Sequence, residues 1–385
     1  MATKALLASI ILTLVTLAAC APAAPAPTPT SPPPAKPTAA PAAPVAPAAT
    51  AAPKAPAATP APAAAKPGAL DALVEGARKE GVVRMVFPGD IGERGARRLN
   101  EAFNKKYNLN IRLEPTLSTS FAIEVGKATT EIKTGASVSW DVMNGTARHF
   151  ADWVPAGYLI TYDWPGTFSH IARDGMLYNG AFVINGGEYY QPLYNPNLVK
   201  PADVPKKWED LLDARWKENI VTHNSAAGWV RLTEFWGEER VTAFVEGFAK
   251  QKPLFVSGLQ VPQRLISGEY PLAATAFVSS IFVEQAKGAP LRYAEEVKPI
   301  IAEQYGLVIL QKAQNPNAAK LFAAFNVTPE GLQIWWEETK RGMPTVPGPL
   351  ADWLKGKEVR YTSVDFLVKE GPRLEDKYLK ILGLR

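Results

Sequence analysis

The sequence predicts an α/β fold with a mostly parallel sheet, and three observations indicate it. From residue 68 onward, short apolar runs of strand length alternate with amphipathic segments of helix length. The segment 92–108 shows the helical pattern, with Ala96, Leu99 and Phe103 on one face. About 318 residues follow the first 67, which is enough chain for one large or two medium domains.

The first half of this region supplies strands and helices in strict alternation. Apolar residues at helical spacing after residue 68 predict a helix that ends at Gly81. The segments expected next are strand 82–87, helix 92–108, strand 110–115, helix 120–135 and strand 140–144. Strands that alternate with helices of this length favour βαβ units, whose strands lie parallel.

The second half is less regular. In 181–195, two β-like runs are joined by Asn-Gly-Gly, which predicts a hairpin. The segments expected after it are helix 208–216, strand 219–223, a helical region 229–249, helix 261–269, strand 271–277, helix 279–288, strand 306–312 and helix 315–325. A last helix is expected to have Thr328 as its N-cap and Pro329 as its first residue.

The N-terminus has the pattern of an export signal. Lys4 precedes the apolar run 5–19, which is short for a membrane span and ends in small residues. The end of this run, 17-LAAC-20, resembles a bacterial lipobox, which implies cleavage before Cys20 and lipidation of its thiol. The alternative is a free, inert cysteine. Cys20 is the only cysteine, so the chain forms no intramolecular disulfide.

Residues 21–67 are expected to form an extended tether. They comprise only Ala, Pro, Thr, Lys, Ser and Val, with 16 prolines in 47 positions, and such a segment has too little apolar surface to offset its ordering entropy. Four of the 42 basic residues and none of the 37 acidic ones precede residue 68, so the rest of the chain is nearly neutral. A nucleic-acid partner is therefore not expected.

Four segments, 82–87, 190–199, 267–277 and 313–333, together resemble the extracytoplasmic solute-binding proteins of ABC importers. The resemblance is to the two-lobed class that includes ferric-iron-binding proteins, and it spans nearly all of 70–350. It implies a type II periplasmic-binding-protein-like fold, in which each lobe is a mixed sheet flanked by helices and hinge strands join the lobes. The expected divisions are a signal peptide at 1–19, a lipidated tether at 20–67, lobe 1 at 68–182 with about 300–342, and lobe 2 at 183–299 with about 343–385.

The resemblance also implies a function. A protein of this class is held outside the cytoplasmic membrane by its lipid on Cys20, captures a small solute between its lobes, and delivers it to an ABC permease and its ATPase. We expect a monomer without a cofactor. A receptor that signals to a membrane sensor remains an alternative, because the sequence does not separate it from a transport protein.

Candidate ligand-binding residues lie in four loops and on one crossing strand. In open α/β sheets, ligands lie beyond the carboxyl ends of strands, near helix N-termini. The corresponding loops are 88–92, 144–148, 223–229 and 277–280. The residues expected to contact the ligand are Asp90, Thr146, Arg148, Tyr189, Tyr190, Ser225, Gly228, Trp229, Phe277 and Ser279. Arg148 and the N–H groups of the 225–228 turn favour a small organic anion, such as a carboxylate or a phosphonate.

Several of these residues also have a structural interpretation. Asp90 is also suited to cap a helix, Arg148 to point into solvent, and Trp229 to lie in the core. Tyr189 and Tyr190 are adjacent on the expected crossing strand, so they point to opposite faces and at most one faces the ligand. Both tyrosines being purely structural stays an alternative.

The resemblance to ferric-iron binders does not extend to their metal ligands. Such proteins use a histidine in the first loop, an acidic residue after the third strand and two adjacent tyrosines later in the chain. Here 88–92 has no histidine, Thr146 stands near the acidic position, and 277–278 is Phe-Val at the tyrosine position. The three histidines, His149, His170 and His223, lack metal-type spacing. We therefore expect no bound metal, and a ferric site with non-standard ligands stays an alternative.

An exported enzyme is an alternative to a binding protein. The sequence contains no G-x-S-x-G, S-x-x-K, H-E-x-x-H or P-loop motif. With Cys20 assigned to the lipid, no thiol nucleophile remains. The sequence therefore predicts a binding protein and no catalytic residues.

Overall fold

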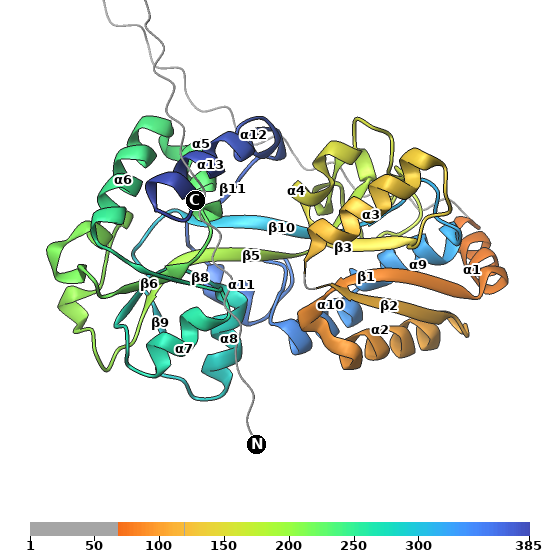
Figure 1. Ribbon diagram of the computed structural model, residues 1–385. Helices are drawn as coiled ribbons and strands as arrows, with labels where there is room; N and C mark the ends of the chain where they lie inside the picture. The colour runs from red at the N-terminus through yellow and green to blue at the C-terminus, as the bar shows by residue number, and fades with distance from the viewer. Residues whose placement is uncertain (1–67, 119) are drawn as a thin grey trace, which may run out of the picture. The chain divides into compact units, whose positions relative to one another are not determined.

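The computed structural model describes residues 68–118 and 120–385 (Figure 1). The predicted signal peptide, Cys20 and the tether lie outside the described residues. The strands are β1 Val82–Pro88, β2 Arg112–Ser118, β3 Val142–Thr146, β4 Met176–Leu177, β5 Phe182–Tyr194, β6 Ile220–His223, β7 Leu254–Val256, β8 Leu272–Phe277, β9 Arg292–Tyr293, β10 Ile300–Ile309 and β11 Val359–Tyr361.

Helices precede, connect and follow these strands. The α-helices are α1 Ala69–Glu80, α2 Gly92–Tyr107, α3 Phe121–Thr134, α4 Ala147–Phe150, α5 Ala227–Trp236, α6 Glu238–Lys250, α7 Gln260–Ile266, α8 Val278–Ala286, α9 Pro316–Asn326, α10 Pro329–Thr339, α11 Pro349–Leu354, α12 Val364–Lys369 and α13 Gly371–Ile381. The helix end expected at Gly81 and the N-cap expected at Thr328 are both present. Gly81 ends α1 with a φ of 68°, and the Thr328 side chain accepts a hydrogen bond from the Gly331 N–H of α10.

One mixed sheet runs through the folded region in the order β2-β1-β3-β10-β5-β8-β6-β7. Strands β2, β1 and β3, here the first sheet end, are mutually parallel, as are β8, β6 and β7, the second sheet end. The two long central strands, β5 and β10, run antiparallel to each other and to their outer neighbours. The expected α/β fold with a mixed sheet flanked by helices is therefore confirmed.

Helices cover both faces of each sheet end (Figure 1). At the first end, one buried cluster joins the sheet to α1, α2, α9 and α10, and another joins it to α3 and α4. At the second end, α5, α6 and α13 pack on one face, and α7, α8 and α11 on the other. The apolar stripes of the helices thus bury both faces of each sheet end, and the charged residues Glu188 and Glu303 lie within the central strands β5 and β10.

The hairpin expected in 181–195 is wrong, because this segment forms the single 13-residue strand β5. A tight hairpin turn needs glycine at positive φ, and Gly186 and Gly187 do not have it. Gly187 provides room instead, because a Cβ there would lie 2.8 Å from the Tyr189 Oη. A register shift between Tyr305 and Gly306 of β10 leaves Asn185 without a ladder partner, so the extra residue is absorbed as a bulge.

Two other expected helices differ from the sequence pattern. The segment 208–216 forms two short 3₁₀ turns, Trp208–Leu212 and Ala214–Trp216. The region 229–249 is divided into α5 and α6 at Gly237, whose φ of 80° breaks the helix. Among residues 68–118 and 120–385, no helix combines the length and apolar character that a membrane span requires. The residue boundaries of the two lobes stay a prediction.

Candidate ligand-binding site

The carboxyl ends of four strands point toward the middle of β5 and β10. Strand β3 ends at Thr146, opposite Tyr305 of β10, and β8 ends at Phe277, opposite Tyr190 of β5. Strand β1 is parallel to β3, and β6 is parallel to β8. The four loops predicted from the sequence therefore follow strands that converge, from both sheet ends, on the same stretch of the crossing strands.

Tyr189 and Tyr190 point to opposite faces of β5, as strand alternation predicts. The Tyr190 hydroxyl donates a 2.6 Å hydrogen bond to Oε1 of Glu303 on β10. The Tyr189 hydroxyl lies 3.0 Å from the hydroxyl of Tyr361, and its ring packs against Trp353. Tyr189 is therefore part of the apolar core behind the sheet, and its expected ligand contact is not supported.

Tyr190, Arg231 and Glu303 form a compact group that we call the Glu303 cluster. Arg231, on α5, forms an ion pair with Glu303, and its guanidinium lies 5.6 Å from the centre of the Tyr190 ring. The side chains of Arg231 and Glu303 are 4% and 10% exposed. Burial, the largest single effect, lowers the pKa of Arg231, but Glu303 together with Tyr190 and Tyr305 raises this pKa overall. Both charges are therefore held by each other inside the protein.

Two histidines face this cluster, one from each sheet end. His149, on α4, places its Nδ1 3.1 Å from the backbone N of Thr146. His223, at the end of β6, packs its ring 5.2 Å from Phe277, whose ring lies 5.4 Å from that of Tyr190. Burial lowers the pKa of each histidine, and the attraction of Glu303 does not overcome it. Both imidazoles are therefore neutral near pH 7.

Asp90, Glu188, Ser279 and Arg341 form a second group, the Glu188 cluster. Glu188 lies directly opposite Glu303 in the β5–β10 ladder. Its carboxylate accepts hydrogen bonds from the Ser279 N–H at 3.3 Å and the Ser279 hydroxyl at 2.7 Å. Arg341 places its Nε 3.5 Å from Glu188 and donates a 2.9 Å hydrogen bond to Asp90. Burial raises the pKa of Glu188, while Arg341 and Ser279 oppose that rise.

Asp90 and Ser225, expected in the loops after β1 and β6, have partners within the protein, and their contact with a ligand stays a prediction. Asp90 is half-exposed and pairs with Arg341, and its side chain caps no helix. Ser225 accepts a hydrogen bond from the Ala227 N–H at the start of α5. The missing side chain of Gly228 lets α5 approach Thr275, because a Cβ there would lie 3.4 Å from the Thr275 methyl group.

Trp229 was expected to form an apolar wall of the site, and the structure contradicts this. It is 1% exposed and packs against Trp208, Phe244 and Phe248 in the core of the second sheet end. The reason is helical geometry, since Trp229 points toward Trp208 and α6, whereas Arg231 reaches Glu303 on β10. Two residues of separation place neighbouring side chains of one helix on different faces.

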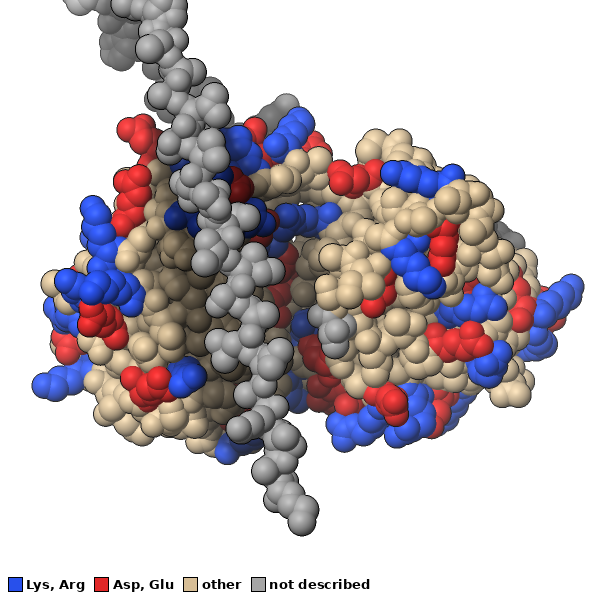
Figure 2. All heavy atoms as spheres, viewed as in Figure 1, with Lys and Arg blue, Asp and Glu red and all other residues tan. Residues whose placement is uncertain are grey.

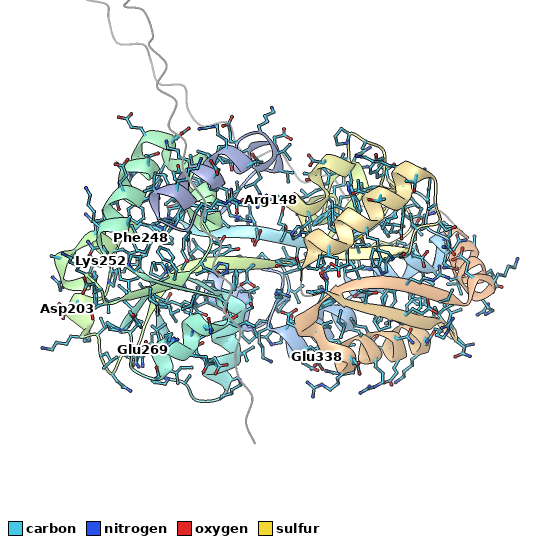
Figure 3. All side chains as sticks on the ribbon, in the orientation of Figure 1. Arg148, Asp203, Phe248, Lys252, Glu269 and Glu338 are labelled. Carbon is cyan, nitrogen blue, oxygen red and sulfur yellow. The ribbon has the colours of Figure 1, made fainter. Side chains whose placement is uncertain are left out.

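Arg148 takes part in a contact between the two sheet ends rather than pointing freely into solvent. Its Nη2 lies 2.8 Å from the Glu375 carboxylate of α13, and both side chains are partly exposed. Figure 3 shows Arg148 between α4 and the helices of the second sheet end. Arg148 and Arg231 each have a carboxylate partner, but Arg231 is buried at the crossing strands and its Nε–H has no hydrogen-bond partner among the described residues, so Arg148 is the weaker candidate for binding an anion.

The sequence-based list omitted Glu188, Arg231, Glu303 and Arg341. A signal was present for three of them, since Glu188, Arg231 and Glu303 stand within apolar segments that form a strand or helix, whereas Arg341 follows the polar end of α10. Charged residues are buried almost only when paired, so such positions indicate a partner elsewhere. The described residues contain no group of three or more His, Cys, Asp or Glu side chains arranged for a metal ion. On the face seen in Figure 2, basic and acidic side chains are interspersed.

Comparison with protein families matches residues 99–355 to the family described as bacterial extracellular solute-binding protein. An uncharacterised protein of Haemophilus influenzae is 27% identical over 142 residues, a match that covers 35% of this chain and 41% of that relative. Less than half of that relative's length is therefore matched.

Solved structures are similar over most of the chain. Iron-bound HitA from Pseudomonas aeruginosa is 16% identical with a TM-score of 0.61, covering 77% of this chain and 99% of HitA. AfuA from Actinobacillus pleuropneumoniae with fructose-6-phosphate is 19% identical with a TM-score of 0.63, covering 79% and 99%. The Atu4243–GABA receptor is 16% identical with a TM-score of 0.64, covering 78% and 97%. At these identities the similarity shows the two-lobed fold alone. Because the family match covers two thirds of the chain, this protein belongs to the bacterial extracellular solute-binding proteins.

Proposed function

We propose that this protein is a lipid-anchored solute-binding protein that captures a small organic anion between its two lobes and delivers it to an ABC permease and its ATPase. The observation that carries the ligand class is Arg231. Its side chain is 4% exposed, faces the crossing strands and keeps an Nε–H without a hydrogen-bond partner among the described residues. An unpartnered guanidinium N–H is a strong, charge-assisted donor to a carboxylate or phosphate oxygen.

The surroundings of Arg231 support the same ligand class. It lies in the second turn of α5, whose first N–H groups belong to the turn that contains Ser225 and Gly228. Helix N-termini favour anions. Phe277 and Tyr190 supply aromatic surface beside it, which suits the carbon skeleton of an organic ligand. Among the structural relatives, one is described with fructose-6-phosphate and one as a GABA receptor, and both compounds carry an acidic group.

The anchor and the location rest on the first residues of the sequence. The apolar run before Cys20 and the segment 17-LAAC-20 support export and lipidation. The proposed location is therefore the outer face of the cytoplasmic membrane, where a monomer meets its permease. We propose no catalytic role and no metal for the residues of the site.

A thermal-shift screen tests the proposal. The purified protein is heated with carboxylates, phosphonates, amino acids, neutral sugars and ferric salts. An organic anion is expected to raise the melting temperature, because a ligand that binds only the folded state stabilises it. The same anion should fail to stabilise the Arg231→Met variant at its own melting temperature. If only ferric salts raise the melting temperature, with a tyrosinate-to-iron absorption band, the organic-anion assignment is wrong.

A further inference from the structure

Helices α5 and α8 begin at the crossing strands, and the groups at their N-termini have different hydrogen-bond partners within the protein. Helix α8 starts at Val278 directly after β8, and helix α5 starts at Ala227 after a short turn that follows β6. Such N-termini favour a negative charge. At α8 a negative charge is present within the chain, because Glu188 accepts hydrogen bonds from both the N–H and the hydroxyl of Ser279.

The Glu188 carboxylate is fixed in that position from two sides. It is 2% exposed and lies between the start of α8 and the guanidinium of Arg341. Arg341 is itself held by Asp90 and lies 4.7 Å from the centre of the Tyr305 ring. The donors that an acidic ligand group would use at α8 are therefore already paired with a protein carboxylate.

The α5 side has no equivalent internal anion at its helix start. The Ala227 N–H is paired with the neutral hydroxyl of Ser225. Arg231 uses Nη2 for Glu303 and Nη1 for the Ala227 carbonyl, and its Nε–H remains without a partner in residues 68–118 and 120–385. Arg341 likewise has an Nε–H without a hydrogen-bond partner among these residues, but it lies 3.5 Å from the Glu188 carboxylate. Arg231 thus retains a donor on the side whose helix start is paired with a neutral hydroxyl.

We propose that Glu188 is a specificity-determining residue that acts as a built-in anion at the start of α8 and restricts the ligand to a single acidic group, bound on the Arg231 side. This inference rests on the proposed function, in which the ligand is an organic anion. A second carboxylate on the ligand would meet a fixed charge of the same sign in a poorly solvated site. Such repulsion is an effective way to reject a competing ligand.

The test uses matched ligands that differ only in the second acidic group. Butyrate and succinate, and pentanoate and glutarate, are titrated calorimetrically into the whole protein and into the Glu188→Gln variant. Glutamine keeps an oxygen that accepts from Ser279 and removes the charge. The wild type is expected to favour each monocarboxylate. The variant is expected to shift that preference toward the dicarboxylate by about tenfold or more, the effect of one like-charge contact.

Two control variants separate the local charge from other effects. Glu269→Gln removes an exposed carboxylate that pairs with Arg264 and should keep the wild-type preference. Ser279→Ala removes a donor to Glu188 without changing the charge and should still favour the monocarboxylate. Figure 3 shows Glu269 near the outer side of the second sheet end.

The outcomes distinguish this inference from the proposed function. If the wild type binds a dicarboxylate more tightly than its matched monocarboxylate, the role of Glu188 is wrong, and this comparison needs no variant to fold. If monocarboxylates bind but Glu188→Gln leaves the preference unchanged, the role of Glu188 is wrong and the organic-anion function stands. If no carboxylate or phosphonate binds either protein, the proposed ligand class is wrong, and the inference about Glu188 falls with it.

Discussion

The Glu303 cluster and the Glu188 cluster place the same residue type at directly opposed positions of β10 and β5, yet the two carboxylates have different partners. Glu303 is paired with the Arg231 guanidinium and the Tyr190 hydroxyl. Glu188 is paired with the start of α8 and shares Arg341 with the half-exposed Asp90. One carboxylate therefore balances a buried cation, and the other balances a helix N-terminus. The partners of each glutamate, rather than the residue type, therefore decide which side of the proposed site can accept a ligand.

The largest expected effect breaks the Glu303 cluster. Arg231→Met leaves Glu303 buried with one hydroxyl donor, and loss of one member of a buried ion pair costs about 3 kcal/mol of unfolding free energy. Chemical denaturation measures this. As a matched control, Arg264→Met removes an exposed pair with Glu269 and should cost about 0.5 kcal/mol. Equal losses in the two variants would contradict the view that Arg231 and Glu303 depend on each other.

The next effect separates the two faces of β5. Tyr190→Phe removes a hydrogen bond to a carboxylate, for which we expect a loss of about 2 kcal/mol. Tyr189→Phe removes a contact between two neutral hydroxyls, for which we expect about 1 kcal/mol. Only Tyr190→Phe should also weaken ligand affinity. A loss of affinity from Tyr189→Phe alone would place the ligand on the opposite face of the sheet.

A smaller effect comes from the histidines that face Glu303. Burial lowers the pKa of His149 and that of His223 below the ordinary histidine value of about 6.5. Between the lowered pKa and that value, the unfolded chain binds more protons than the folded chain, so stability falls as the pH decreases. Glu303 attracts both imidazoliums, while Arg148 and Arg231 repel that of His149.

Melting curves between pH 7 and pH about 5.5, just below the ordinary histidine range, measure this effect. The His149→Gln and His223→Gln variants should each lose less stability than the wild type over that interval. Glu188, whose pKa is raised, acts in the opposite direction, since its folded form gains stability on protonation. If both variants keep the wild-type slope, the two histidines are not buried beside Glu303 as described.

The smallest expected effect on stability comes from the ion pair between Arg148 and Glu375. Arg148→Gln removes a partly exposed ion pair with Glu375 and should cost about 0.5 kcal/mol or less. Glu375→Gln is the matched control, because it removes the same pair from the other side. If Arg148 acts only through this pair, the two variants change ligand affinity equally. A loss of affinity in Arg148→Gln alone would assign Arg148 to the ligand.

The local pattern of the sequence determined much of the fold. Apolar spacing predicted most helices and strands, Gly81 and Thr328 marked helix ends, and the order of the elements placed four loops at strand ends. These features depend on residues a few positions apart, whose conformations are governed by backbone geometry and nearby hydrogen bonds. For the same reason, the alternation of Tyr189 and Tyr190 across β5 could be predicted before their partners were known.

Only the tertiary structure decided which charged residues meet. Arg231 and Glu303 are 72 positions apart, and Glu188 and Ser279 are 91 apart, so no local pattern links them. The same holds for the burial of Trp229 and for the continuity of β5, where Gly187 provides space for the Tyr189 side chain and no turn forms. Pairing of buried charges depends on which strands are neighbours in the sheet, and that order is set by long-range packing. The pattern of residues therefore predicted the helices, the strands and the edge of the sheet where we propose that a ligand binds. Long-range packing decided that Glu303 pairs with Arg231 and that Glu188 accepts hydrogen bonds at the start of α8.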